Sequence, residues 1–173
     1  MEEQRLEIVT ASELVPAGSL VLERLRGVEE LSRPYEYELE LRVEEDGGLS
    51  VDVLEDLLRQ PCMVRFGRDG TTEVHGLLRS IAMRSTHTPT PIRYRAALVP
   101  RVWLASQVRR SRIFQELGVP GIVQVLLEEL GLEEDQHFEL RLNGSYPERE
   151  YTVQYQESDL DFLHRLLEHE GIS

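Results

Sequence analysis

The sequence of 173 residues has no lysine, a single cysteine and no long apolar run. One cysteine, Cys62, can form neither an internal disulfide nor a multi-cysteine metal site, so both are excluded. No apolar stretch approaches the length of about 20 residues that a bilayer-spanning helix needs. The acidic start MEEQRLEIVT does not resemble a secretory signal peptide. We therefore expect a chain that folds in the cytoplasm without a membrane anchor.

Positive charge is scarce and comes only from arginine. Lys+Arg is 19 against 32 acidic residues, which gives a formal net charge of -13. An acidic surface repels phosphate backbones, and the doublet Arg109-Arg110 is too small to offset it, so nucleic acid is not an expected partner. The length suits one domain, or one domain plus a piece of another.

The clearest structural signal is the strict alternation over residues 35–43. Apolar side chains fall on one face of this segment, and Glu36, Glu38, Glu40 and Arg42 on the other. Because side chains change faces at each strand residue, the pattern predicts a half-buried antiparallel strand with an acidic, solvated face. That face either lines a lumen or simply keeps the sheet soluble, and we favour solvation because charged outer strand faces are common.

Further strands and turns surround this segment. Strands are predicted over 19–25, 63–66, 71–78 and 92–99, and a short helix over 51–58. The dipeptide Asp69-Gly70 is typical of a tight hairpin turn, and Gly76 within a strand indicates a bulge or a close backbone approach. Turns are also predicted at 44–48 and 86–91. Short strands separated by turns favour a small antiparallel β-barrel over residues 1–104.

Residues 105–173 have a different pattern. Helices are predicted over 120–130 and from Ser158 to Gly171, the second beginning with a Ser158–Asp161 capping pattern. Between them, 138–142 and 151–155 alternate like strands joined by a turn at 143–147. The predicted fold class is therefore α+β and mainly β: a small antiparallel barrel followed by a small α/β segment.

Two side-chain groups on the last helix suggest chemistry. His164 and Glu168, with Glu170 nearby, have metal-ligand spacing, but no HExxH motif or third ligand accompanies them. Glu157 and Asp161, with Asp159 between them, form a carboxylate cluster of the kind that acid–base catalysis uses. Helix capping and the helix dipole explain Asp161 and Asp159 without catalysis. We therefore predict no catalytic, cofactor-binding or metal-binding residues.

The remaining candidates are also interpreted as structural. Cys62 has the apolar neighbours Pro61, Met63 and Val64, which is typical of a small core residue rather than of a nucleophile. The aromatic residues Trp103, Tyr151 and Tyr155 are expected in the core or at an interface. No glycine motif for phosphate or dinucleotides is present.

Four stretches together resemble the N-terminal region of the VgrG family, the spike proteins of bacterial type VI secretion systems, which is similar to the tail hub of contractile phages. The most specific of them is residues 146–172, YPEREYTVQYQESDLDFLHRLLEHEGI. The others are GVEELSRPYEY at 27–37, His75-Gly76, and SRIFQ at 111–115 followed by VPGI at 119–122.

This resemblance implies a structural role without catalytic residues. It implies a homotrimeric hub that caps the hexameric tube of Hcp, contacts baseplate proteins, and carries effectors or a tip protein on C-terminal parts. It also implies delivery outside the cell or into a target cell. Gly121 occupies a position that is commonly acidic in the family. Because a second barrel would follow in the family, the chain is expected to be a truncated copy.

Two alternatives stay open at this point. One is a baseplate hub of a contractile phage tail or an extracellular injection system, which the same pattern describes. The other belongs to a different class: a carboxylate- or metal-dependent hydrolase that uses Glu157, Asp161 and His164. Stoichiometric zinc that is lost on His164→Ala would favour the second.

Overall fold

The computed structural model describes residues 6–16, 18–43, 48–67, 71–84 and 91–173, which form two compact units, 1–100 and 101–173. The predicted turns at 69–70, at 44–47 and at 86–90 lie outside the described residues. Among the described residues, no helix is long and apolar enough to cross a membrane. The two units are described separately below.

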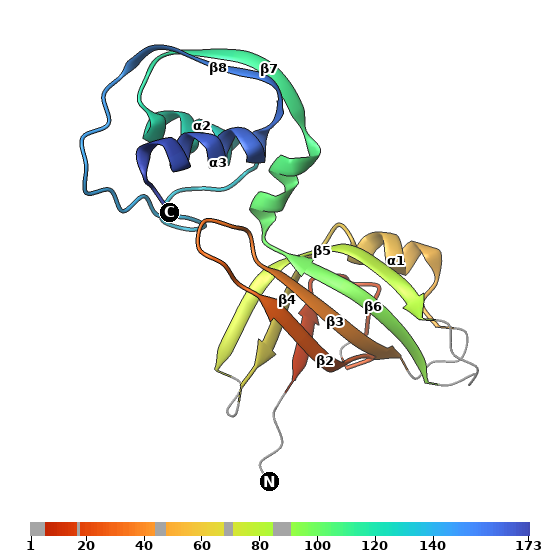
Figure 1. Cartoon of the computed structure of the whole chain (residues 1–173). Coiled ribbons are helices and arrows are strands. Elements are labelled where there is room, and N and C mark those ends of the chain that lie inside the picture. The colour runs from red at the N-terminus through yellow and green to blue at the C-terminus, as the bar shows by residue number, and fades with distance from the viewer. Residues whose placement is uncertain (1–5, 17, 44–47, 68–70, 85–90) are drawn as a thin grey trace. The chain divides into compact units, whose positions relative to one another are not determined.

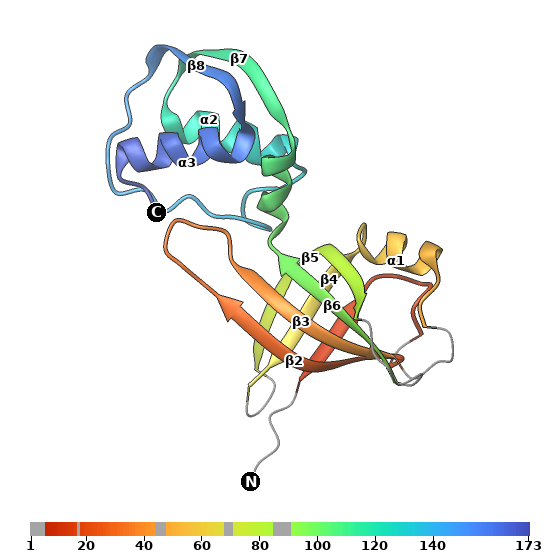
Figure 2. The same cartoon turned by 45° about the vertical axis from the view of Figure 1, so that its right-hand side comes forward.

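The first unit is a curled, six-stranded antiparallel sheet with one short helix (Figures 1 and 2). The strands follow the order β1-β4-β5-β6-β3-β2, and no ladder joins the edge strands β1 and β2 in the part of the chain described. This mainly β, curled architecture confirms the predicted fold class. The elements are β1 (Glu7–Thr10), β2 (Leu20–Val28), β3 (Glu36–Val43), α1 (Val51–Leu57), β4 (Pro61–Phe66), β5 (Thr72–Arg84) and β6 (Ile92–Val99).

The alternation of β3 builds the core of this unit. Tyr37, Leu39, Leu41 and Val43 are buried on its inner face, as predicted. β3 pairs with both β2 and β6, and these strands supply further buried residues such as Leu22 and Leu98. Tyr94 of β6 is also buried, and its hydroxyl accepts a hydrogen bond from the backbone N–H of Leu49 at 2.7 Å. The sheet therefore folds around its own apolar face.

Gly76 confirms the predicted close backbone approach. A Cβ built at this position would lie 2.2 Å from the carbonyl oxygen of Val99, which is shorter than any normal contact. Glycine allows β5 and β6 to meet at this point of the sheet.

The second unit packs two helices against one face of a two-stranded ribbon (Figure 1). Its core joins Phe114 of the ribbon to Ile122 and Leu126 of one helix and to Phe162 and Leu166 of the other. The elements are the 3-10 helix η1 (Arg101–Gln107), β7 (Arg109–Leu117), α2 (Val119–Glu129), β8 (Arg149–Ser158) and α3 (Asp159–Glu170).

The helix ends match the sequence signals, whereas one strand prediction is wrong. Gly131 and Gly171 both adopt the left-handed conformation expected after a helix, with φ of 70° and 68°. Residues 138–142 form no strand and have only an isolated bridge between Glu134 and Phe138. The partner of β8 is instead β7, which the sequence analysis did not identify as a strand. Local alternation could not show this, because the pairing joins residues about 40 positions apart.

Candidate functional site

The carboxylates that flank the start of α3 have structural partners. The hydroxyl of Ser158 accepts a hydrogen bond from the backbone N–H of Asp161 at 3.0 Å and donates one to its carboxylate at 2.6 Å. Glu157 forms an ion pair with Arg165 at 2.6 Å. Each carboxylate therefore has a structural partner of its own: Arg165 for Glu157 and the capping residue Ser158 for Asp161.

Asp159 is the most buried of these carboxylates, with 5% of its side chain exposed. It accepts a hydrogen bond from the Gln154 amide at 2.7 Å, and the guanidinium groups of Arg110 and Arg112 lie 3.3 and 3.4 Å away. Glu129 of α2 pairs with the same two arginines at 2.9 and 2.8 Å. This network ties both helices to the inner face of the ribbon, because a buried charge requires compensating partners.

The histidine and acidic residues of α3 do not assemble into a metal site. His164 is half-buried and Glu168 is exposed. Across the described ranges, no group of three or more His, Cys, Asp or Glu side chains is placed to hold a metal ion. No third ligand therefore joins the His164–Glu168 pair that the sequence spacing suggested.

Cys62 lies in the core of the first unit, as its apolar neighbours indicated. Burial raises the pKa of its thiol to about 12. Because the thiolate is the reactive form, a thiol with this pKa is almost entirely protonated and inert at neutral pH.

The outer face of the curled sheet carries more arginine than β3 alone indicates. We define this face as the side of β2, β3, β5 and β6 that points away from the core. Glu38 and Glu40 of β3 lie on it as predicted, but Arg26 is paired in register with Glu38, and Arg24 and Arg95 lie on either side of Glu40. The predicted acidic face of β3 is therefore present, but the outer face of the whole sheet is not acidic, because the neighbouring strands supply more arginine than β3 supplies glutamate.

A β-bulge places the β2 arginines on this face. The pairing of β2 with β3 shifts between Leu22 and Arg24, so Glu23 is the additional residue. The bulge reverses the alternation, and as a result Leu20 and Leu22 point inward before it while Arg24 and Arg26 point outward after it. Inward-facing leucines are two positions apart before the bulge and three apart across it, from Leu22 to Leu25. This change of spacing is a sequence signal that could have revealed the bulge.

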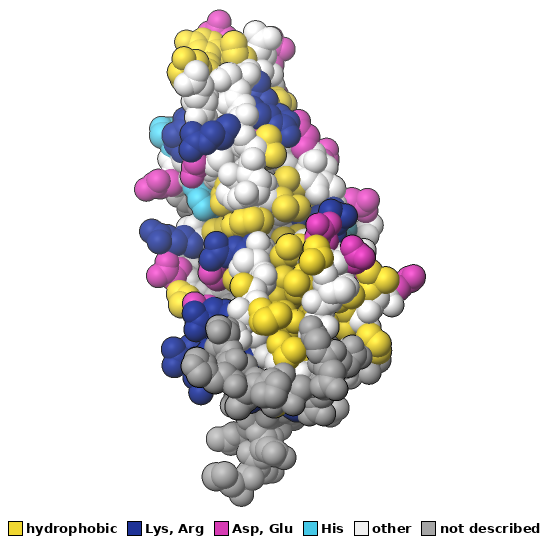
Figure 3. Space-filling view, turned by 90° about the vertical axis from the view of Figure 1, so that its right-hand side faces the viewer, with side chains coloured by type: hydrophobic (Ala, Val, Ile, Leu, Met, Phe, Trp, Pro, Cys, Tyr) yellow, Lys and Arg dark blue, Asp and Glu magenta, His cyan; other side chains and the backbone are white. Residues whose placement is uncertain are grey.

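The ribbon of β7 and β8 has an unusual distribution of side chains. Its inner face holds the polar Arg112, Thr152 and Gln154 beside the core residue Phe114, whereas several large apolar side chains lie on its outer face. Hydrophobic side chains gather at the upper end of Figure 3, over this ribbon. The exposed fractions are 63% for Ile113, 61% for Tyr151, 41% for Val153 and 70% for Tyr155.

We call these four side chains the ribbon face. Tyr151 and Tyr155 are thus not core residues of the chain, and only the interface part of their prediction stays open. Monomeric proteins seldom leave several large apolar side chains together in water, so the ribbon face is a candidate contact surface.

Comparison with known proteins gives a consistent result. Residues 28–173 match the family model of the phage tail baseplate hub (GPD). The chain is 45% identical over 146 residues to the type VI secretion system spike protein VgrG4b of Pseudomonas aeruginosa, covering 84% of this chain and 17% of that protein. It is 36% identical over 171 residues to the spike protein VgrG1b of the same organism, covering 98% and 22%.

A solved structure is also similar. The Escherichia coli c3393 protein, a component of the type VI secretion system with structural similarity to the T4 bacteriophage tail proteins gp27 and gp5, matches with a TM-score of 0.76 and 26% identity. The match covers 94% of this chain and 42% of that one. The chain thus spans about a fifth of the length of the two spike proteins that it matches.

Proposed function

Because the chain belongs to the phage tail baseplate hub family, a family of structural proteins and not of enzymes, we propose that it is the N-terminal hub segment of a type VI secretion spike. In this role its two units serve as a rigid scaffold. A curled sheet with a self-contained core provides stiffness, and the carboxylates of α3 are used to hold the second unit together. This arrangement suits mechanical work better than hydrolysis.

The observation that carries the proposal is the ribbon face. We propose that the full-length protein forms a homotrimer and that Tyr151, Tyr155 and their two neighbours are covered in it. Burying apolar area stabilises an interface by about 25 cal/mol per Å², so several exposed aromatic and aliphatic side chains can contribute substantially.

The trimer then caps the Hcp tube within the baseplate and is delivered with its effectors out of the cell or into a target cell. Before assembly the protein is cytoplasmic. The similarity to type VI spike proteins supports this role, and we infer that effectors or a tip protein are carried by parts outside the segment that matches.

The trimer can be tested with the full-length parent protein. Light scattering after size-exclusion chromatography should give a trimer, and the double variant Tyr151→Glu/Tyr155→Glu should shift the mass toward the monomer. Leu14→Glu/Leu31→Glu is the matched control, because Leu14 and Leu31 are 53% and 82% exposed outside the ribbon and the two substitutions introduce the same charge. A double variant that remains as trimeric as the control would rule out the ribbon face as the contact.

The isolated chain of 173 residues should be monomeric or only weakly associated, because it covers so little of the spike proteins. A stable trimer of this chain alone would show that the other regions are not needed for assembly.

A second candidate is a baseplate hub of a contractile phage tail or an extracellular injection system. The family model, which takes its description from the phage hub, favours this reading. The two functions differ in their tube partner. Binding to a phage tail tube protein but not to Hcp, measured by co-sedimentation, would favour the second.

A further inference from the structure

The outer face of the curled sheet is positively charged although the chain is strongly negative. Seven arginines and four glutamates lie on it among the described residues, in a chain with a net charge of -13. The arginines are Arg24, Arg26, Arg42, Arg79, Arg84, Arg93 and Arg95, and the glutamates are Glu23, Glu36, Glu38 and Glu40. A local excess of cations on an acidic protein marks a surface suited to an anionic partner.

Part of this excess is already neutralised inside the sheet. Glu23 pairs with Arg93 at 2.7 Å and with Arg42 at 3.1 Å, Glu40 pairs with Arg84 at 3.4 Å, and Glu36 pairs with Arg79. The Glu23–Arg42 pair joins adjacent strands and the others reach across one intervening strand, so the charges of these pairs are compensated within the sheet.

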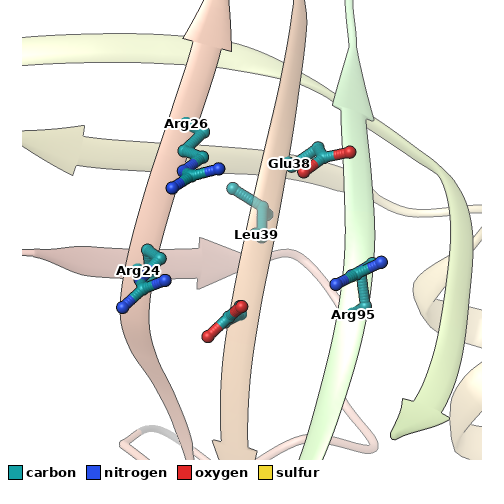
Figure 4. A pocket seen from close by; sticks show the side chains of 6 residues that line it. Arg24, Arg26, Glu38, Leu39 and Arg95 are labelled. Carbon is teal, nitrogen blue, oxygen red and sulfur yellow. The ribbon is translucent and has the colours of Figure 1, made fainter.

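Three arginines remain outside these pairs. The guanidinium groups of Arg24, Arg26 and Arg95 have no hydrogen bond or ion pair with any residue that the structure describes. They line a small, solvent-open hollow of about 60 Å³, together with Glu38, Leu39 and Glu40. Figure 4 shows Arg24 and Arg26 on one strand and Arg95 across the hollow.

The spacing of these arginines matches an extended peptide. Arg24 and Arg26 are two positions apart on β2, and strand residues two apart are separated by about 7 Å. Side chains two apart on an extended ligand have the same separation. A guanidinium binds a carboxylate through two parallel hydrogen bonds, which makes glutamate or aspartate a fitting ligand.

The two glutamates in the hollow favour an acidic peptide over a phosphate backbone as the ligand. Glu38 and Glu40 lie between the arginines and would repel a continuous run of phosphates. An extended peptide carries backbone N–H donors that can approach these carboxylates, whereas a phosphate backbone carries none. We propose that the outer face around Arg24, Arg26 and Arg95 binds an acidic protein segment in an extended conformation.

The proposal can be tested by NMR titration of the full 173-residue chain with a peptide of sequence Glu-Ser-Glu-Ser-Glu-Ser-Glu at low salt. Binding should be saturable, should weaken as salt is added, and should shift amide resonances of β2, β3 and β6. The variant Arg24→Glu/Arg95→Glu should weaken it about tenfold or more, because like charges then face the peptide.

The control variant carries substitutions of the same type at Arg33 and Arg59, which lie outside the outer face and pair with exposed glutamates. It should change the affinity less than about twofold, since exposed ion pairs contribute little. Equal weakening in both variants would show that attraction depends only on net charge, and no weakening in either would show that the peptide binds elsewhere. Either result would overturn the proposal.

Two further measurements test which kind of molecule binds the outer face. A single-stranded oligonucleotide with the same number of charges should bind more weakly than the peptide; tighter binding would overturn the choice of a protein segment. The chain alone should sediment as a monomer at the titration concentration. Self-association that the Arg24→Glu/Arg95→Glu variant abolishes would assign the face to a second copy of this chain and contradict the proposal.

Discussion

The two units of the chain distribute polar and apolar side chains in opposite ways. In the first unit the apolar faces of the strands are turned inward, and the outer face is covered by arginine and glutamate. In the second unit the ribbon buries polar groups such as Gln154 against the helices and exposes Tyr151 and Tyr155. A sheet that completes its own core can remain in water, whereas a ribbon with an apolar outer face is suited to a neighbour.

This difference separates two kinds of contact. The charged outer face of the first unit favours reversible, salt-dependent binding, since exposed charges are screened by ions. The ribbon face favours a permanent contact, because apolar burial does not depend on charge. The predictions below test whether each unit owes its stability to the contacts assigned to it.

The largest effect is expected in the helix core of the second unit. Leu163 is buried in α3, so Leu163→Asp places an unpaired charge in the core and should cost about 3–5 kcal/mol. Hydrogen exchange should show loss of protection in residues 101–173 while the sheet stays protected. Leu167→Asp is the matched control at a partly buried position and should cost less. Unchanged stability of Leu163→Asp would mean that the buried face of α3 is misassigned.

The first unit should lose stability when Gly76, at its tightest backbone contact, is substituted. Gly76→Val places a branched side chain against the carbonyl of Val99 and should cost about 2–3 kcal/mol of unfolding free energy in urea. His75→Val, one residue earlier and exposed, should be close to neutral. Equal stability of the two variants would show that β5 and β6 can separate at Gly76 without cost.

The sequence revealed those features that depend on neighbours along the chain. The alternation of β3, the cap at Ser158 and the stop at Gly171 are local, and each was predicted. The pairing of β7 with β8 and the arginines beside Glu38 and Glu40 depend on strand order and on a bulge, so β3 alone could not indicate the charge of the whole outer face.

The ribbon face is an intermediate case. The alternation of β8 was visible in the sequence. The usual assumption that apolar residues point inward would, however, place Tyr151 and Tyr155 on the buried side, whereas they are exposed. Only the polar network around Asp159 shows that Gln154 belongs to the buried side. Its partners come from β7 and α2, far away in the sequence.

A smaller effect of opposite sign is expected at the start of α2. A Cβ at Gly121 would have its nearest contact at an ordinary 3.5 Å from a Leu117 methyl group, so Gly121→Ala should stabilise the second unit by about 0.5–1 kcal/mol. Gly118→Ala should not, because its Cβ would lie 2.9 Å from the carbonyl oxygen of Tyr146. Thermal unfolding of both variants measures the difference, and a stabilising Gly118→Ala would contradict the described contact.

The smallest effect concerns acid stability of the first unit. The hydrogen bond from Arg93 lowers the pKa of Glu23 from 4.5. A lowered folded-state pKa contributes stability that is present above about pH 4.5 and is lost as the pH falls through the folded value. Glu23→Gln should therefore reduce the loss of stability between pH 5 and pH 3 by a few tenths of a kcal/mol. Unfolding followed at each pH by a probe in the sheet tests this, and an unchanged pH profile would contradict it.

The most direct test of the hub assignment is co-sedimentation of the full-length parent protein with assembled Hcp tubes. The account predicts that the parent pellets with the tubes in stoichiometric amounts per tube end, and that shorter tubes at equal Hcp mass bind more of it. Absence from the pellet at every salt concentration tested, with a parent protein shown to be trimeric, would contradict the assignment.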